Sequence, residues 1–450
     1  MSDYVETEFG EFPKNWEVKR LSEIAELQRG LGYSGKEKSK DEIPDGYLFL
    51  TLNSIKKGGG LKEDGWTWIK SDRLKERHFV REGDIVIVNT DLSNDGSLIG
   101  SPAIVHFPEW YKKEKAVFSL DIFKLLLKVS NVDVNFLFYY LIFVQPLARK
   151  YHTGTTVWRI NVDSWARDLL IPLPPLEEQK KIVEILDTVD SIITDTTNLV
   201  EKLRVIKEKA LNLLITGSIW HKEFIDTEFG EFPKNWEVKR LSEIAELQRG
   251  LGYSGKEKSK DEIPDGYLFL TLNSIKKGGG LKEDGWTWIK SDRLKERHFV
   301  REGDIVIVNT DLSNDGSLIG SPAIVHFPEW YKKEKAVFSL DIFKLLLKVS
   351  NVDVNFLFYY LIFVQPLARK YHTGTTVWRI NVDSWARDLL IPLPPLEEQK
   401  KIVKMLSIID NKIEVETRYL EYLKRLKEKL LTALMSGRIR VNSITISDLL

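Results

Sequence analysis

The residues whose types and spacing come closest to a known chemical motif lie between Gly30 and Glu37. Three glycines there match the G-x-G-x-x-G spacing of dinucleotide-binding loops, and Gly35 followed by Lys36 also completes a G-x-x-x-x-G-K phosphate-binding pattern. A phosphate-binding loop needs Ser or Thr after the lysine to bind Mg²⁺, whereas Glu37 would place a carboxylate beside the phosphate oxygens. A dinucleotide site needs a helix that starts at the glycines, and a polar loop follows instead. We therefore interpret both matches as accidental.

Metal-ligand and nucleophile patterns are the next candidates for chemistry, and they are incomplete. The chain has no cysteine, which excludes disulfides, thiolate catalysis and cysteine-ligated zinc. Its seven histidines form no H-E-x-x-H motif, and we interpret His78, His106 and His152 as structural. His221 and Glu223 match the H-x-E of zinc deaminases, but that motif needs cysteine ligands, so we interpret this segment as a linker. Since there is no G-x-S-x-G elbow either, we predict no catalytic residue, metal or cofactor in this chain.

Basic and amide side chains near tryptophans offer a different chemistry, which is contact with nucleic acid. Lysines and arginines cluster on both sides of Trp66 and Trp68, as suits a phosphate-binding face, and Arg159 and Asn161 could pair with guanine and adenine edges. Two simpler alternatives stay open: a solvated surface over core tryptophans, and a loop whose Arg and Asn only brace the next element. The candidate DNA-binding residues are Lys56, Lys57, Arg73, Lys75, Arg77, Asn89, Thr90, Ser93, Asn94, Trp158, Arg159 and Asn161, with Lys276, Lys277, Arg293, Lys295, Arg297, Asn309, Thr310, Ser313, Asn314, Trp378, Arg379 and Asn381.

Composition limits these interpretations. A chain of 450 residues with 43% hydrophobic content can form more than one globular domain. Its 66 basic and 66 acidic residues argue against a uniformly basic coat, so DNA contacts would be local patches. The first residues lack a signal-peptide pattern, and no apolar run reaches the roughly 18 residues that span a bilayer. We expect a soluble cytoplasmic protein, which the lack of cysteine also fits.

An internal repeat determines how the candidate residues are positioned. The segment from Thr7 to Val183 recurs letter for letter from Thr227 to Val403, so 177 residues are duplicated. A period this long indicates a duplicated domain rather than a solenoid unit. The sequence does not say whether the duplication is natural or engineered. The expected division is into a first domain, a first spacer helix, a second domain, a second spacer helix and a C-terminal tail, at residues 1–173, 174–217, 218–393, 394–437 and 438–450.

Each copy ends in a segment with the pattern of a long helix. A proline cluster ends the preceding strand, and acidic residues suited to a first helical turn follow it. Apolar residues then recur at alternating spacings of four and three, a frame interrupted at Thr196 and Lys207 in the first helix and at Glu416 and Lys427 in the second. The residues expected to pack the helices are Ile182, Leu186, Val189, Ile193, Leu203, Leu214, Ile402, Leu406, Ile409, Ile413, Leu423 and Leu434.

An apolar stripe on a helix of about 40 residues, about 60 Å long, needs a partner helix to cover it. The available partner is the duplicate helix of the same chain. Because the segments before the two copies are also similar, at residues 3–6 and 223–226, we predict an antiparallel coiled coil with pseudo-two-fold symmetry and circular closure of the chain. The alternative is that each helix packs on its own domain.

The pattern before each helix is mixed. Residues 46–52, 84–88 and 169–172 are short runs rich in strand formers and bounded by turn residues, whereas Val134 to Val144 is typical of a buried helix. Glycines 58–60 and the polar string 89–96 indicate loops that could reach a ligand. The predicted fold class is therefore α+β, with two identical globular domains separated by the two long helices.

Three stretches, each present twice, resemble the specificity subunits of type I restriction-modification enzymes. They are residues 12–16 leading to 21–24 with Arg29 and Gly30, residues 154–156 before Ile160 and Asn161, and residues 171–179 with Ile182. The third stretch, followed by a helix that ends before Gly217 or Gly437, is the most specific. The resemblance covers nearly the whole chain.

The resemblance implies a chain that catalyses nothing itself. Each domain would be a target-recognition domain that reads one half of a bipartite site in double-stranded DNA. The long helices would set the spacing and dock two methyltransferase subunits, which bind S-adenosylmethionine, and motor-nuclease subunits would join them to cleave unmodified DNA. Members of the family usually carry two different recognition domains, so the identical pair here predicts a symmetric, inverted target.

Two other classes of function stay open on the sequence. A stand-alone two-domain DNA-binding or architectural protein would differ in having no methyltransferase partner. A nuclease or nucleotide hydrolase would depend on the glycine loop, and unchanged function after mutation of Lys36 and Lys256 would remove it. The bases read, the spacer length and the presence of a nuclease subunit do not follow from the sequence.

Overall fold

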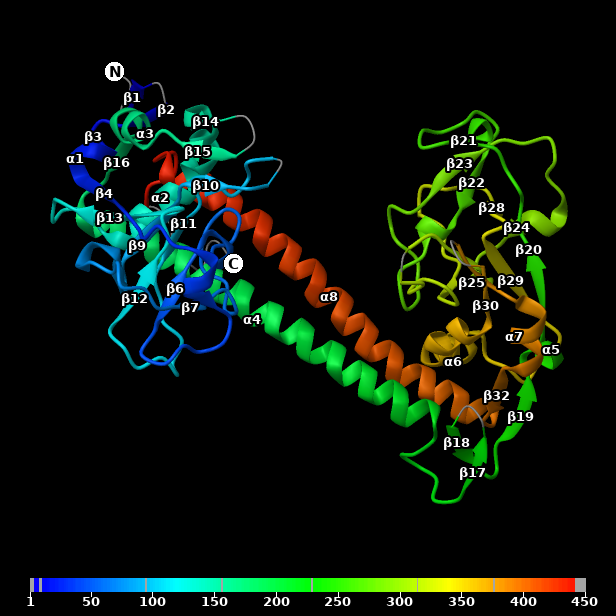
Figure 1. The fold of residues 1–450 in the computed structure, drawn as a ribbon. Helices are drawn as coiled ribbons and strands as arrows, with labels where there is room; N and C mark the ends of the chain where they lie inside the picture. The colour runs from blue at the N-terminus through cyan, green and yellow to red at the C-terminus, as the bar shows by residue number, and fades with distance from the viewer. Residues whose placement is uncertain are drawn as a thin grey trace. The chain divides into compact units, whose positions relative to one another are not determined.

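The computed structural model describes residues 4–7, 10–93, 95–154, 157–227, 230–313, 315–374 and 377–441, with the backbone alone for residues 4–7, 10 and 11. The chain divides into two compact units (Figure 1). Unit 1 contains Met1–Thr197 and Arg418–Leu450, and unit 2 contains Asn198–Thr417. Each unit therefore combines one copy of the repeated domain with parts of both long helices.

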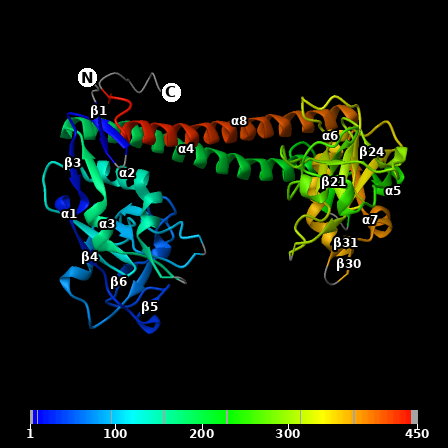
Figure 2. The ribbon, with the colours of Figure 1, turned by 90° about the horizontal axis from the view of Figure 1, so that it is seen from above.

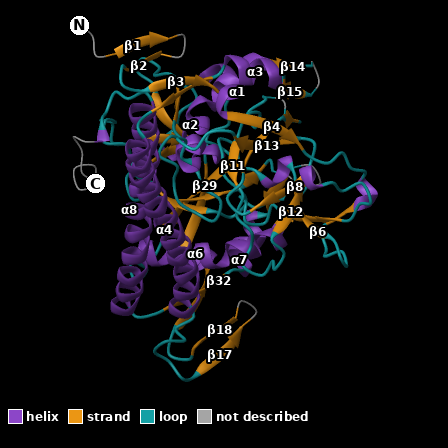
Figure 3. Ribbon diagram, turned by 90° about the vertical axis from the view of Figure 1, so that its left-hand side faces the viewer, coloured by secondary structure: helices purple, strands orange, loops and turns teal. Residues whose placement is uncertain are grey.

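The domain of unit 1 is built of short strands and a few helices, which confirms the mixed fold class (Figure 3). The strands are β1 (Tyr4–Thr7), β2 (Gly10–Pro13), β3 (Glu17–Arg20), β4 (Ala25–Arg29), β5 (Lys38–Ser39), β6 (Tyr47–Leu50), β7 (Thr67–Ile69), β8 (Phe79–Arg81), β9 (Ile85–Val88), β10 (Thr90–Asp91), β11 (Pro102–Ile104), β12 (Lys115–Phe118), β13 (Ile122–Leu127), β14 (His152–Thr153), β15 (Trp158–Ile160) and β16 (Leu170–Leu173). The helices are α1 (Leu21–Ile24), α2 (Val134–Val144) and α3 (Val162–Asp168), with the 3-10 helices η1 (Gly35–Glu37), η2 (Leu52–Ser54), η3 (Glu76–His78) and η4 (Gln145–Tyr151). The strand orders are β1-β2, β16-β3, β10-β15-β14, β11-β9-β13-β4 and β5-β7-β6-β12-β8.

The domain of unit 2 has the same sheets in the same strand orders. Its strands are β17 (Phe224–Thr227), β18 (Gly230–Pro233), β19 (Glu237–Arg240), β20 (Ala245–Arg249), β21 (Lys258–Ser259), β22 (Tyr267–Leu270), β23 (Thr287–Ile289), β24 (Phe299–Val300), β25 (Ile305–Val308), β26 (Thr310–Asp311), β27 (Pro322–Ile324), β28 (Ala336–Phe338), β29 (Ile342–Leu347), β30 (His372–Thr373), β31 (Trp378–Ile380) and β32 (Leu390–Leu393). Its helices are α5 (Leu241–Ile244), α6 (Val354–Val364) and α7 (Val382–Asp388), with η5 (Gly255–Glu257), η6 (Leu272–Ser274), η7 (Glu296–His298) and η8 (Gln365–Tyr371).

The core of each domain follows from its apolar runs. All four side chains of β9 are buried between β11 and β13, as expected for a β-branched run with no polar face. Helix α2 is apolar on all sides and mostly buried, and Asp133 caps it by accepting a hydrogen bond from the backbone N–H of Phe136. The strands predicted within 46–52, 84–88 and 169–172 and the helix predicted from Val134 to Val144 are confirmed.

The prediction that residues 89–96 are entirely loop is wrong at its start. Thr90 and Asp91 form β10, which pairs antiparallel with Arg159 and Trp158 of β15. The pairing partner lies far along the chain, so short-range turn propensities could not reveal this strand.

Each domain is followed by one long helix, as predicted (Figure 2). These helices are α4 (Leu176–Ile215) and α8 (Leu396–Met435). Each is followed by a glycine in the left-handed region, Gly217 with φ 69° and Gly437 with φ 66°. No helix in the described part of the chain is long and apolar enough to cross a membrane.

A buried glutamine attaches the start of each long helix to its own domain. Gln179 is fully buried, and its side-chain oxygen accepts a hydrogen bond of 2.8 Å from the Asp133 backbone N–H. Its amide nitrogen donates to the carbonyls of Asn131 and Pro174, at 2.9 and 2.8 Å. Gln399 makes the equivalent three bonds in unit 2. This contact agrees with the alternative that each helix packs on its own domain.

The two long helices also share a buried cluster inside each unit. In unit 1, Ile182 and Leu186 of α4 belong to the same core as Leu430 and Leu434 of α8. In unit 2, the shared core contains Leu211, Leu214, Ile215, Ile402 and Leu406. The lysines that interrupt the apolar frame form ion pairs of 2.5 Å, from Lys427 to Asp190 in unit 1 and from Lys207 to Asp410 in unit 2.

Candidate nucleic-acid interface

A small three-stranded sheet brings together two loops that are remote in sequence. Strand β15 pairs with β10 on one side and with β14 on the other. The Ile160 backbone N–H donates a hydrogen bond of 3.1 Å to the Asn89 carbonyl, and the Asn161 N–H donates one of 2.7 Å to the Tyr151 carbonyl. The polar string after β9 and the loop around Trp158 therefore form one surface, which we call the β10–β14 surface.

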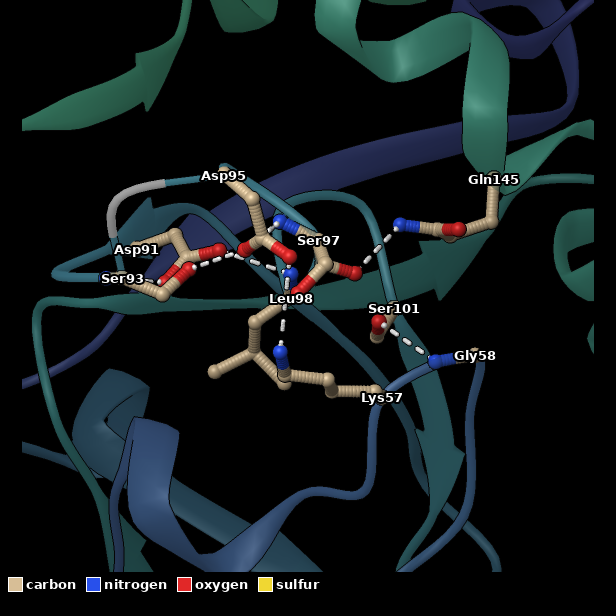
Figure 4. Close-up of polar contacts among 9 residues, drawn as sticks. All are labelled: Lys57, Gly58, Asp91, Ser93, Asp95, Ser97, Leu98, Ser101 and Gln145. Atoms are coloured by element: carbon tan, nitrogen blue, oxygen red, sulfur yellow. Dashed lines mark hydrogen bonds and ion pairs between the residues drawn. The ribbon is translucent and has the colours of Figure 1, made fainter. Parts of the chain in front are cut away.

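Two aspartates give the loop at residues 91–98 its shape (Figure 4). The buried Asp91 carboxylate accepts hydrogen bonds of 2.7 Å from the backbone N–H groups of Ser93 and Leu98. Asp95 accepts one of 2.8 Å from the Ser93 hydroxyl and one of 3.1 Å from the Ser97 backbone N–H. The Ser93 and Ser97 bonds and the nearby Lys57 ammonium hold the pKa of Asp95 well below its usual range. The loop is thus closed by two carboxylates, of which Asp95 has the lowered pKa.

The glycine-rich turn after Lys56 lies beside this loop. The Gly58 backbone N–H donates to the Ser101 hydroxyl at 3.2 Å, and Lys57 forms an ion pair of 3.7 Å with Asp95 (Figure 4). Both side chains of this pair are largely exposed, so its stabilising effect is small. The structure therefore places Lys57 and Ser93 on the same carboxylate, that of Asp95, as one combined surface would require.

Trp158 joins the loop to the hairpin of β14 and β15. Its half-buried ring stacks on the His152 ring, with centroids 4.3 Å apart. On Gly96, which has φ +59°, a Cβ atom would come within 2.7 Å of the Trp158 ring. Glycine at position 96 therefore lets the loop approach the tryptophan closely, and Arg159 remains exposed next to it.

Three of the predicted residues have structural tasks in this surface. Asn161 caps helix α3, because its side-chain oxygen accepts a hydrogen bond of 3.2 Å from the Ser164 backbone N–H. Asn89 and Thr90 are buried beneath the loop, with 8% and 2% of their surface exposed, so they do not lie on the surface where a ligand could reach them. In the second copy Asn381 is also a cap, Thr310 is buried and Asn309 is half-buried. Asn94 and Asn314 lie outside the described residues.

The predicted basic cluster at residues 73–77 lies on different elements. Arg73 forms an ion pair of 2.5 Å with Glu37, and this bond is the main reason that the pKa of Glu37 falls to about 2. The Lys75 backbone N–H donates to His78 Nδ1, and Arg77 Nε lies 3.1 Å from His78 Nε2. As far as the described residues go, these contacts involve η1 and η3 and not the β10–β14 surface. Arg293, Lys295 and Arg297 repeat this arrangement in unit 2.

The glycine motif is not arranged as a phosphate-binding loop. Gly30 packs against the backbone, where a Cβ atom would come within 2.3 Å of the Ser119 carbonyl oxygen. The Glu37 carboxylate accepts a hydrogen bond of 2.6 Å from the Ser34 N–H, a backbone group that a phosphate would need. No group of three or more metal-binding side chains occurs among the residues that the structure describes.

Sequence reasoning missed His152 as part of this surface, and it placed Asp95 and Gly96 in a loop that could reach a ligand without giving them a role. His152 was expected to be structural, yet its side chain is exposed. A signal was present, since a glycine between two runs of strand formers, here Gly154, is typical of a hairpin. Unit 2 repeats the surface: His372 stacks on Trp378 at 4.4 Å, and Lys277 pairs with Asp315 at 3.5 Å.

The fold and the β10–β14 surface define a protein of two equal modules, each a mixed α+β domain with a polar loop surface and a long helix. Residues 13–206 and 233–425 each match the family described as type I restriction modification DNA specificity domain. The chain therefore belongs to the type I restriction-modification specificity family.

Relatives of known name agree with this membership. A Methanocaldococcus jannaschii protein named for the type I restriction enzyme MjaX specificity subunit is 28% identical, over 98% of this chain and 97% of its own length. The type I restriction enzyme MjaVIII specificity subunit of the same organism is 27% identical, over 99% of both chains. Among solved structures, the Type-I restriction-modification system S subunit from M. genitalium has a TM-score of 0.53 at 15% identity, over 93% of this chain and 96% of its own. That likeness concerns the fold.

Proposed function

We propose that this chain is the DNA-specificity subunit of a type I restriction-modification enzyme and catalyses no reaction itself. Residues 1–173 and 218–393 would be target-recognition domains that each read one half of a bipartite site in double-stranded DNA. The observation that carries the proposal is the duplication, within this family, of one loop surface with the same polar side chains. These are Lys57, Ser93 and Arg159 in the first domain and Lys277, Ser313 and Arg379 in the second.

The long helices would form an antiparallel coiled coil, with pseudo-two-fold symmetry and circular closure of the chain. Support comes from matched contacts inside the units. Lys427 and Asp190 in unit 1 correspond to Lys207 and Asp410 in unit 2, each with the end of one helix beside the start of the other. The segments after the helices are matched too. Arg440 bonds Glu178 in unit 1, and His221 bonds Glu398 in unit 2.

The same helices would set the distance between the half-sites and dock two methyltransferase subunits. Exposed apolar side chains support a docking role, since Leu199, Ile206 and Leu213 recur every seven residues along α4, as do Ile408 and Val415 along α8. The methyltransferase subunits would bind S-adenosylmethionine, and motor-nuclease subunits could join the complex. Balanced charge in this chain fits partners that supply much of the phosphate-binding surface.

Two identical domains in such an arrangement would read a symmetric target, with one half-site inverted across a non-specific spacer. The test is to express the chain with a type I methyltransferase subunit in a host that lacks adenine methylation and to map methylated adenines across the genome. We expect one inverted, bipartite motif, and none when the methyltransferase is expressed alone. Two unrelated half-sites would contradict the symmetric target.

A stand-alone DNA-binding or architectural protein is the second candidate function. It predicts tight, specific DNA binding by the isolated chain and no stable complex with a methyltransferase. The proposal predicts weak, salt-sensitive binding by the isolated chain and co-purification with the methyltransferase. Measuring both properties on the same preparation separates the two candidates.

A further inference from the structure

His152 and His372 are exposed aromatic bases that the structure holds in one orientation. His152 lies on the edge strand β14, and its ring rests on Trp158, whose other neighbour is Gly96. The ring planes of His152 and Trp158 are tilted by 38°, and those of His372 and Trp378 by 39°. An exposed side chain that is held by stacking loses little conformational entropy when it binds a ligand.

A backbone carbonyl determines which ring nitrogen carries the proton. His152 Nδ1 lies 2.8 Å from the Arg149 carbonyl oxygen, and His372 Nδ1 lies 2.8 Å from the Arg369 carbonyl oxygen. A carbonyl oxygen only accepts hydrogen bonds, so Nδ1 must be the donor. In the neutral ring Nε2 then carries the lone pair, and none of the described residues donates a hydrogen bond to it. Each domain therefore presents a fixed hydrogen-bond acceptor at its surface.

A fixed acceptor selects its ligand by chemistry. A phosphate oxygen is itself an acceptor and cannot pair with Nε2 of the neutral ring. In the DNA major groove the donors are the exocyclic amino groups of adenine and cytosine. Arg159, next to the ring stack, adds donors suited to guanine or to phosphate.

We propose that His152 and His372 are specificity-determining residues, each accepting a hydrogen bond at Nε2 from the amino group of one adenine or cytosine in its half-site. This inference rests on the proposed function and extends it to one atom and one class of base. Because the two domains are identical, the two contacts fall on the same position of the two half-sites.

The test uses the complex of the full chain with its methyltransferase and a duplex that carries the mapped site. Each adenine or cytosine of the half-sites is replaced, one position at a time and symmetrically, by purine or 2-pyrimidinone, which lack only the amino group. At one position, the complex of the unsubstituted chain should bind the modified duplex roughly 100-fold more weakly than the mapped site. This loss corresponds to roughly tenfold for each half-site.

The matched variants are His152→Phe with His372→Phe, which keep a ring on the tryptophan but remove the acceptor. This double variant should bind the unmodified site roughly 100-fold more weakly and should lose nothing further at that same position. His152→Gln with His372→Gln, whose amide oxygen is an acceptor, should recover part of the affinity.

The possible failures are distinguishable. If the Phe variant weakens binding to every duplex alike, the histidines contact phosphate or only support the loop, and the inference is overturned. The inference is also overturned if the loss of affinity from the Phe variant and the loss from the base replacement simply add at every position. If the unmodified complex binds no specific site at all, the proposed function itself fails.

Discussion

Units 1 and 2 contain the same domain sequence but attach it to different helix residues. In unit 1 the Tyr139 hydroxyl lies 2.7 Å from an Asp187 oxygen and 2.8 Å from an Asp190 oxygen. In unit 2 the equivalent Tyr359 hydroxyl lies 2.8 Å from an Asp410 oxygen and has no second carboxylate partner among the described residues, because Ser407 stands where unit 1 has Asp187. The β10–β14 surface is thus repeated in both units, while the attachment of the domain to the helices differs.

The contact after each long helix differs in the same way. Arg440 makes two hydrogen bonds to the Glu178 carboxylate, at 2.9 and 3.0 Å, and lies over the Trp16 ring. In unit 2, His221 makes one bond of 2.7 Å to Glu398 and meets the Trp236 ring edge-on. A guanidinium binds a carboxylate with two parallel bonds, whereas an imidazole makes only one. Unit 1 therefore has the stronger attachment on both counts.

The largest expected effect concerns the buried glutamine contact, which the two units share. Replacing Gln179 or Gln399 by Leu leaves one backbone N–H and two carbonyls unpaired, so each change should lower local stability by about 3 kcal/mol. Hydrogen exchange of the helix starts, at residues 176–190 and 396–410, measures it. Lys180→Ala, at an exposed ion pair, is the control. If the losses of local stability from the two substitutions differ by more than about 1 kcal/mol, the glutamine contact is not equivalent in the two units.

An effect of medium size is expected at the contact after each long helix, where the units differ. Arg440→Ala leaves the Glu178 carboxylate, only 9% exposed, without this partner and should cost about 2 kcal/mol of local stability in unit 1. His221→Ala should cost about 1 kcal/mol in unit 2, because one bond is lost and the Glu398 side chain is 18% exposed. Hydrogen exchange of the same segments reports both. His221→Arg should bring the local stability of unit 2 closer to that of unit 1. If the two alanine variants lose the same local stability, unit 1 does not have the stronger attachment.

The smallest effect comes from exchanging one residue between the units. Burial raises the pKa of Tyr139, and the carboxylates of Asp190 and Asp187 raise it further. Asp187→Ser should therefore let Tyr139 ionise at a lower pH and should cost about 0.5 kcal/mol, because Asp187 is exposed. Hydrogen exchange of residues 176–190 measures this loss of local stability, with Ser407→Asp as the reciprocal change near Tyr359. An unchanged exchange rate would show that Asp187 has no part in the attachment.

Much of the fold was predictable because it depends on local patterns. The apolar run from Val134 to Val144 could only be a buried helix, and the alternating spacing after Pro175 could only be a long amphipathic one. Strand β10 was missed because its partner, β15, is remote in sequence. Lys207 and Lys427 interrupted the predicted stripe, and their roles emerged only with Asp410 and Asp190 beside them.

The candidate site was predictable in composition but not in arrangement. Lys57, Ser93 and Arg159 were identified by residue type, and the structure brings their loops together. Arg73 was grouped with Lys57 because both are basic, but its ion pair with Glu37 places it with other elements. The helix cap Asn161 shows that a polar residue near a loop can serve the backbone, and Thr90 is buried beneath the loop. The role proposed for His152 depends on Trp158 and the Arg149 carbonyl, contacts that no local pattern encodes.

The division of the chain into units has a consequence for its synthesis. Unit 2 is one continuous stretch, Asn198–Thr417, whereas unit 1 needs residues from both sides of that stretch. During translation, Ile182 and Leu186 therefore lack their packing partners Leu430 and Leu434 until unit 2 has been synthesised. That synthesis takes roughly 10–45 s at ordinary elongation rates. The domain that is translated first is thus the last to be completed, and its half-formed helix surface is the part of the nascent chain most in need of protection by chaperones.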